Sequence, residues 1–209
     1  SRPERQAPRL AELRGACDYL GFTLVPTRPG GLERINPETR RQDPAHWRTC
    51  VERIATLLDR QQPQFVFLPH AADWNSTHIG THHLVMDALA QMPADFDCVL
   101  LETEYWAAHP APNLMVESGT NDVADLVAAT SFHVEEVRRN PYHLLLPAWM
   151  QDNVRRGGEL VGGQGSAVPD CVFSTLYHRR RWSRGALQAS PPGGRMILLK
   201  DDPVVALSD

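Results

Sequence analysis

Four polar residues that could do chemistry are crowded into one short stretch of the chain: Asp73, Asn75, His78 and His82. The two histidines are four positions apart, so on a helix they share one face. A zinc-protease site of the HExxH type is excluded, because Ile79 stands where that motif requires glutamate. The spacing alone leaves three interpretations open: a metal site, an acid–base site, or two histidines that cap or cover a helix.

A strand and a helix are predicted to position these residues. The apolar run 65–68, closed by Pro69, is typical of a buried strand, and His70 follows it directly. Polar side chains at the C-terminal end of a buried parallel strand are where an α/β sheet places its ligand site. This position supports a functional site, and the structural interpretation stays open beside it. The apolar residues that predict the following helix are Ile79, Val85, Met86 and Leu89.

Helical and strand patterns alternate along the rest of the chain. They predict an α/β fold, three-layered and Rossmann-like, with a largely parallel sheet and helices on both faces. One domain over residues 1–185 and a C-terminal extension over residues 186–209 are expected. The predicted helices cover residues 10–20, 44–60, 123–139 and 144–156, and the further strands cover residues 22–25, 98–101, 114–116, 172–177 and 196–199.

Composition narrows the class of partner. The chain has 209 residues, of which 42% are hydrophobic and 22% charged, which is ordinary for a soluble globular protein. The formal net charge of −4 gives no electrostatic reason to expect nucleic acid or an anionic membrane as a partner. The four cysteines form no CxxC motif, which favours free buried thiols and a cytoplasmic location. No run approaches the length of a transmembrane helix.

Four stretches, taken in order, resemble motifs of the PIG-L/LmbE-like zinc-dependent N-deacetylases. Residues 65–89 resemble the second motif of that family, which is a strand, a proline and an Asp followed by a histidine turn and a helix. Residues 73–82 fit the Asp, the turn and the start of the helix. Residues 9–12, in a helix that ends at Leu20-Gly21, resemble its R-x-x-E helix. Residues 112–117 resemble its Pro-Asn strand, and residues 129–136 resemble a later helix with His133 in register. The resemblance covers residues 1–178.

The resemblance implies metal-assisted hydrolysis of an amide, with Zn2+ or another divalent metal as cofactor. The substrate would be an N-acetylated amino sugar or its glycoside, which would give acetate and a free amine. The resemblance implies six residue roles: His78 as metal ligand, Asn75 as the donor to the oxyanion, Asp73 as the group that orients a histidine or the turn, His82 as support behind the ligand, and Arg9 and His133 as substrate contacts.

The sequence departs from the family pattern in ways that matter for the metal. The family holds zinc with a histidine equivalent to His78 and with a His and an Asp of a His-Pro-Asp-Asp segment that this sequence lacks. A catalytic zinc site needs three protein ligands. We therefore expect the first strands and this segment to lie outside the sequence, as a removed piece or a separate chain. The alternatives are a non-catalytic sugar-binding relative and an assembly subunit, and a homo-oligomer is left open.

Overall fold

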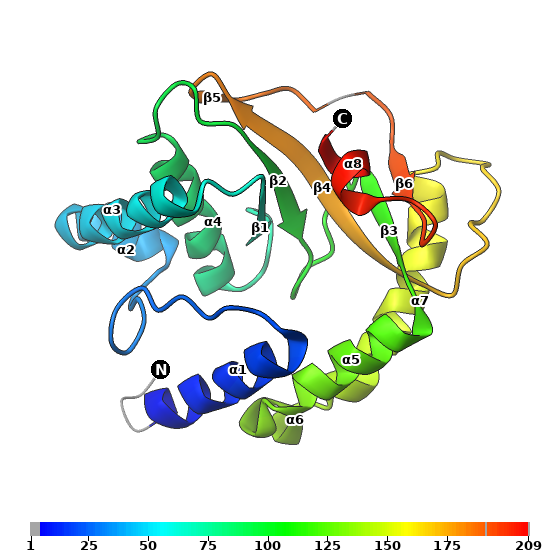
Figure 1. Cartoon of the computed structure of the whole chain (residues 1–209), viewed down its shortest axis with the longest axis horizontal. Helices are drawn as coiled ribbons and strands as arrows, with labels where there is room; N and C mark the ends of the chain where they lie inside the picture. Colours follow the sequence, from blue (N-terminus) through cyan, green and yellow to red (C-terminus); the bar gives the residue numbers. More distant parts are fainter. Residues whose placement is uncertain (1–4, 191, 209) are drawn as a thin grey trace.

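The computed structural model describes residues 5–190 and 192–208, and it shows a mixed α/β fold built around one six-stranded sheet (Figure 1). The predicted domain ends, residues 1–4 and 209, lie outside the described residues. The order across the sheet is β1 (Phe65–Pro69), β2 (Cys98–Thr103), β4 (Phe173–Ser183), β3 (Leu114–Ser118) and β6 (Arg195–Ile197), with β5 (Ala186–Leu187) paired to β4.

The sheet is mixed, which corrects the expectation of a largely parallel one. β1 pairs with β2 in parallel, and so does β3 with β6. Between the two pairs runs β4, antiparallel to both β2 and β3. β4 also extends well beyond the predicted strand 172–177. The basic run 178–181 continues it, because alternate side chains of that run point to opposite faces of the sheet.

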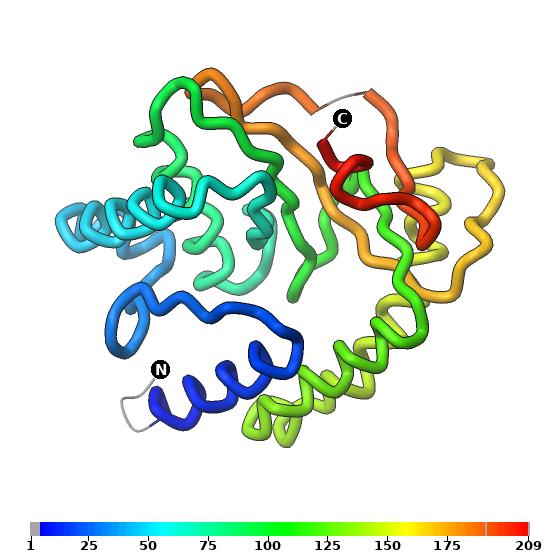
Figure 2. The backbone as a smooth tube through the Cα atoms, viewed as in Figure 1, coloured from blue at the N-terminus to red at the C-terminus, as the bar shows by residue number. Residues whose placement is uncertain are grey.

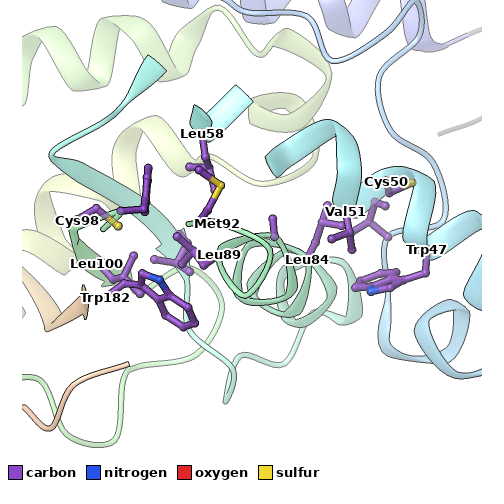
Figure 3. Packing of buried hydrophobic residues seen from close by; sticks show 14 residues of the cluster. Trp47, Cys50, Val51, Leu58, Leu84, Leu89, Met92, Cys98, Leu100 and Trp182 are labelled. Atoms are coloured by element: carbon purple, nitrogen blue, oxygen red, sulfur yellow. The ribbon is translucent and has the colours of Figure 1, made fainter. Parts of the chain in front are cut away.

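Two helices cover one face of β1 and β2 and bury the largest apolar cluster (Figure 3). α3 (Pro44–Gln61) starts at Pro44, and the Asp43 side chain caps it by accepting a hydrogen bond from the backbone N–H of His46. α4 (Ser76–Leu89) lies between α3 and the sheet (Figure 1). The cluster includes Trp47, Val51, Leu58, Leu84, Leu89, Cys98, Leu100 and Trp182.

The remaining helices lie at the ends of the chain or follow β3. α1 (Gln6–Leu20) leads into a segment that crosses back toward α2 (Pro37–Gln42) (Figure 2). Residues 22–25 of this segment form no strand, because they pair with no neighbouring strand. The predicted helix 123–139 is two helices, α5 (Thr120–Ser131) and α6 (Val134–Arg139), broken at residues 132–133. α7 (Tyr142–Leu160) packs on β4.

Residues after 185 add to the same sheet. β6 pairs with β3, and α8 (Pro203–Ser208) buries Leu207 against Val99, Leu101 and Leu114 on the face opposite α3 and α4. The division of the chain at residue 185 stays a prediction. No helix among the described residues is long and apolar enough to cross a membrane.

A glycine inside α4 allows the site helix to touch the preceding chain. A Cβ on Gly80 would lie 2.5 Å from the Asn36 Cα atom, which is backbone and cannot swing aside. We expect Gly80→Ala to lower the free energy of unfolding by about 1–3 kcal/mol through overpacking. As a matched control, Gly158→Ala in α7 meets nothing closer than 3.4 Å. It should gain up to about 1 kcal/mol from helix propensity. If urea unfolding shows that both substitutions change the free energy of unfolding in the same direction, the close approach at Gly80 is contradicted.

Candidate functional site

The candidate site lies where β1 and β2 end. Pro69 and Thr103 are paired in the β1–β2 ladder, so the two strands finish level with each other. The turn 70–75 and the loop 104–111, which follow these strands, therefore lie side by side. This is the edge at which open α/β sheets bind ligands.

Asp73 is the centre of this edge. Its side chain is 0% exposed. Its Oδ1 atom accepts a hydrogen bond from the backbone N–H of Asn75 at 2.7 Å, and its Oδ2 atom accepts from Trp106 at 3.1 Å and from Ala107 at 3.5 Å. Burial by itself would raise the pKa of Asp73, but these three amides and the neighbouring His78 outweigh it and lower the pKa. The carboxylate is therefore held ionised at neutral pH.

His78 is the neighbour of this buried charge. Its Nδ1 atom lies 3.2 Å from the Asp73 Oδ1 atom, within ion-pair range, although the ring is not aligned for a hydrogen bond. The Tyr105 ring packs against the His78 ring, with 5.0 Å between the centroids. The His78 side chain is 25% exposed while its Nδ1 atom is buried, so the edge of the ring away from Asp73 is the accessible one.

Asn75 is the N-cap of α4. Its Oδ1 atom accepts hydrogen bonds from the backbone N–H groups of Thr77 at 2.8 Å and of His78 at 3.4 Å. The cap fixes where α4 begins and so where His78 stands. Because the oxygen is committed to the helix, the predicted donor role would fall to the Nδ2 group, and that role stays a prediction.

His82 turns toward the end of β1. Its Nδ1 atom lies 3.0 Å from the Pro69 carbonyl oxygen and 3.6 Å from the Glu102 Oε1 atom. Burial lowers the pKa of His82, and the nearby carboxylate of Glu102 only partly opposes this shift. His82 is therefore neutral at pH 7 and joins α4 to β1. Its predicted role in supporting a metal ligand stays a prediction.

Arg9 and His133 lie on other elements. The Arg9 Nη2 atom forms an ion pair with the Glu136 Oε1 atom at 2.6 Å, which joins α1 to α6. His133 is the residue at which α6 begins. Both helices lie at the bottom of Figure 1, where α1 and α5 also pack together. The substrate contacts predicted for these two residues stay predictions.

Two glutamates of this edge, the buried Glu102 and the half-buried Glu104, were missed by the sequence analysis. Glu102 contacts His82 and His109, and Glu104 forms paired hydrogen bonds with Arg156 of α7, both at 2.8 Å. A signal did exist, because both glutamates stand at the end of the apolar run 98–101, the same position that drew attention to residues 70–78.

A surface hollow of about 450 Å³ lies elsewhere, near the amino end of β2. Asp95, Arg184 and the ion-paired Asp97 and Arg181 line it. The carboxyl edge has the buried, charge-coupled groups that this shallow hollow lacks, so we place the candidate site at the carboxyl edge.

The described residues do not form a complete zinc site. Over residues 5–190 and 192–208, no group of three or more His, Cys, Asp and Glu side chains is arranged to hold a metal ion. What this part of the chain supplies is one accessible histidine backed by a carboxylate. That donor set suits a single ligand position.

Comparisons with known proteins show the fold. No family model matches the sequence, and no curated protein matches it. The conserved protein TT1542 from Thermus thermophilus is similar in structure, with a TM-score of 0.54 and 19% identity over 85% of this chain and 74% of that chain. GalB, the 4-carboxy-2-hydroxymuconate hydratase from Pseudomonas putida KT2440, has a TM-score of 0.57 and 17% identity over 86% and 73%. At such identities the likeness shows the fold alone, and membership of the PIG-L/LmbE-like family stays a prediction.

The lowered pKa of His82 predicts a pH dependence of stability. In the unfolded chain His82 regains an ordinary pKa, so between about pH 7 and about pH 5 the unfolded state binds more protons and stability falls as the pH falls. His82→Asn keeps an N–H donor for the Pro69 carbonyl and cannot titrate. We expect the free energy of unfolding of this variant to vary less with pH over that interval. If the free energy of unfolding falls with pH equally steeply in wild type and in His82→Asn, His82 is not a buried neutral imidazole.

Proposed function

We propose that this chain is the α/β part of a metal-dependent hydrolase that removes an N-acyl group, an acetyl group above all, from an amino sugar or amino-sugar glycoside. In the proposal it is a Rossmann-like member of the PIG-L/LmbE-like family. The observation that carries the proposal is the Asp73–His78 pair. Histidines that bind metals donate the N–H of the other ring nitrogen to a carboxylate, a backbone carbonyl or water, which fixes the ring and strengthens the ligand.

Asp73 suits the supporting half of such a pair. It is fully buried, ionised and held by three backbone amides, so it cannot rotate away from His78. The accessible edge of His78 then faces outward with its ring fixed between Asp73 and Tyr105. Asn75, at the start of the same helix, would donate its side-chain N–H to the carbonyl oxygen of the substrate amide.

Aromatic rings around the pair support a sugar as the substrate. Trp74, Tyr105 and Trp106 are all exposed although they are large and apolar, and all three adjoin Asp73 or His78. Exposed aromatic side chains that cluster at a polar site mark a binding surface. The C–H groups on one face of a pyranose ring pack well on such rings. From Trp106 the row continues through Tyr142 to Trp149, which gives room for an aglycone.

The further metal ligands would come from a segment that pairs with the free edge of β1. Among the residues that the structure describes, β1 has a partner strand, β2, on one side only. The Val99 N–H bonds to the Gln64 carbonyl, and in a parallel ladder this register turns the backbone groups of Phe65 and Phe67 outward. The Phe67 side chain is 58% exposed beside that edge. About a quarter of each of the two similar structures lies outside the part that matches this chain.

A second candidate is a non-catalytic protein of the same fold that binds a sugar, or a subunit that serves assembly. The observation in its favour is the lack of a three-ligand group among the described residues. Sugar binding without zinc would favour the first of these alternatives. A stable hetero-oligomer that binds neither sugar nor zinc would favour the assembly subunit. Addition of water to an unsaturated acid without release of acetate would favour a hydratase instead.

Metal content tests the proposed function. We expect about one zinc ion per chain in the purified natural protein, by mass spectrometry of metals, together with release of acetate from N-acetylglucosamine glycosides. His78→Ala should lose both, because it removes the accessible ring that Asp73 supports. Asp73→Asn should weaken metal binding by about 10–100-fold.

The matched control for this test is His83→Ala, which removes a neighbouring histidine that packs against His82. It should leave metal content and acetate release unchanged. Zinc bound equally by wild type and His78→Ala, or acetate released from metal-free protein, would contradict the proposal.

The aromatic surface gives a separate prediction. Trp106→Ala keeps the backbone amide that Asp73 needs and removes only the ring. We expect it to weaken binding of the sugar by about 2–10-fold, measured by calorimetry, because one ring contact is lost. Tyr19→Ala removes an equally exposed ring from α1 and should have no effect. Equal affinities of Trp106→Ala and wild type would show that the sugar does not rest on this ring.

A further inference from the structure

A buried carboxylate beside the site takes no part in the proposed chemistry. Glu102, on β2, is 4% exposed. Groups from three elements surround it: His82 of α4 at 3.6 Å, His109 of the loop 104–111 at 3.4 Å and Arg180 of β4 at 3.7 Å. His178 of β4 pairs with it across the sheet. A carboxylate buried at this depth needs such partners, because burial penalises its charge.

The hydrogen bonds around His109 determine its tautomer. The His109 Nδ1 atom accepts a hydrogen bond from the backbone N–H of Ala111 at 3.0 Å. In the neutral ring the proton is therefore on Nε2, the atom that faces the Glu102 Oε2 atom. The ring is also confined, since it stacks on His178 with 4.7 Å between centroids and meets His70 edge-on at 5.0 Å. The Glu102 Oε2 atom thus lies 3.4 Å from the N–H edge of a ring that is confined on both sides.

His109 in turn anchors the loop that holds Asp73. The His109 backbone N–H donates to the Glu104 Oε1 atom at 2.8 Å, and Arg156 holds the same carboxylate. Between these anchors lie Trp106 and Ala107, whose amides donate to Asp73.

We propose that Glu102 is a positioning residue of the site: through His109 it fixes the loop 104–111, and thereby keeps the amides of Trp106 and Ala107 on Asp73. Without the carboxylate, the buried N–H of His109 loses its acceptor, and an unsatisfied buried donor is costly enough to open a short loop. Asp73 then loses two of its three backbone donors, and His78 loses a fixed partner. The effect on turnover rests on the proposed function, but the placement of the amides does not.

The charge of Glu102 is available over the physiological range. Burial would raise the pKa of Glu102, but the interaction with His109, the positive charge of Arg180 and the charges that His82 and His178 carry when protonated outweigh burial and lower the pKa. Because the folded pKa is the lower one, the contribution of Glu102 to stability is complete at neutral pH. It is lost only as the pH falls through that lowered value.

Hydrogen exchange of backbone amides, followed by NMR, tests this role without any assay of activity. In Glu102→Gln, whose side-chain NH2 must face one of the surrounding donors, we expect the Trp106 and Ala107 amides to exchange about tenfold faster or more. The Val99 amide, which bonds to Gln64 in the β1–β2 ladder, should keep its rate. Unchanged rates at Trp106 and Ala107, or an equal rise at Val99, would overturn the proposal.

Two substitutions of His109 serve as a matched pair and remain informative if Glu102→Gln does not fold. His109→Gln places an N–H donor near the position of Nε2 and should keep the two amides protected. His109→Asn places an oxygen near the position of Nδ1, retains only the Ala111 bond, and should behave like Glu102→Gln. The ¹⁵N spectrum of the wild type should show the Nε2–H tautomer of His109. The proposal would also be overturned if His109→Asn protected the two amides better than His109→Gln did, or if wild-type His109 were the Nδ1–H tautomer.

Turnover gives a further readout if acetate release is found. Glu102→Gln should then lower kcat about tenfold or more while KM stays within about threefold, because Glu102 touches no substrate. A wild-type protein that releases no acetate would count against the proposed function and would leave the exchange result standing. A normal kcat in Glu102→Gln would count against the positioning role alone.

Discussion

The structure depends on keeping one carboxylate charged where water does not reach it. Asp73 is ionised because three backbone amides point at it, and those amides come from the two stretches that follow β1 and β2. The two strands must therefore run parallel and end level, as they do at Pro69 and Thr103. The packing of α3 and α4 under these strands holds that alignment, and the Glu104–Arg156 pair ties the second loop to α7.

The sequence predicted the local half of this arrangement well. The strand at 65–68, the polar turn and the helix after it were all expected, because an apolar run, a proline and the helical spacing of apolar residues act over a few residues. The contact between Asp73 and His78 is also local, five positions apart. Its role in binding a metal is not tested by the structure.

The non-local half could not be read from the sequence. Arg180 reaches Glu102 across 78 positions, and Arg156 reaches Glu104 across 52, so no short window contains both partners. Strand direction has the same difficulty: the pattern of β4 marks it as a strand, but only its neighbours β2 and β3 make it antiparallel. Residues 22–25 show the converse, a strand-like run that finds no partner. Tertiary pairing overrides local preference in each of these cases.

The surroundings of Glu102 have a consequence for how the protein can change during descent. Basic side chains from a helix, a loop and a strand surround one carboxylate. Loss of the glutamate leaves the surrounding side chains without their shared carboxylate, and loss of one of them leaves the buried charge with fewer partners. Single replacements at these positions should therefore lower stability, while joint replacements need not. We therefore expect four positions to change together during evolution: Glu102, His82, His109 and Arg180. A lineage that abandons one of them should be found to have abandoned the others.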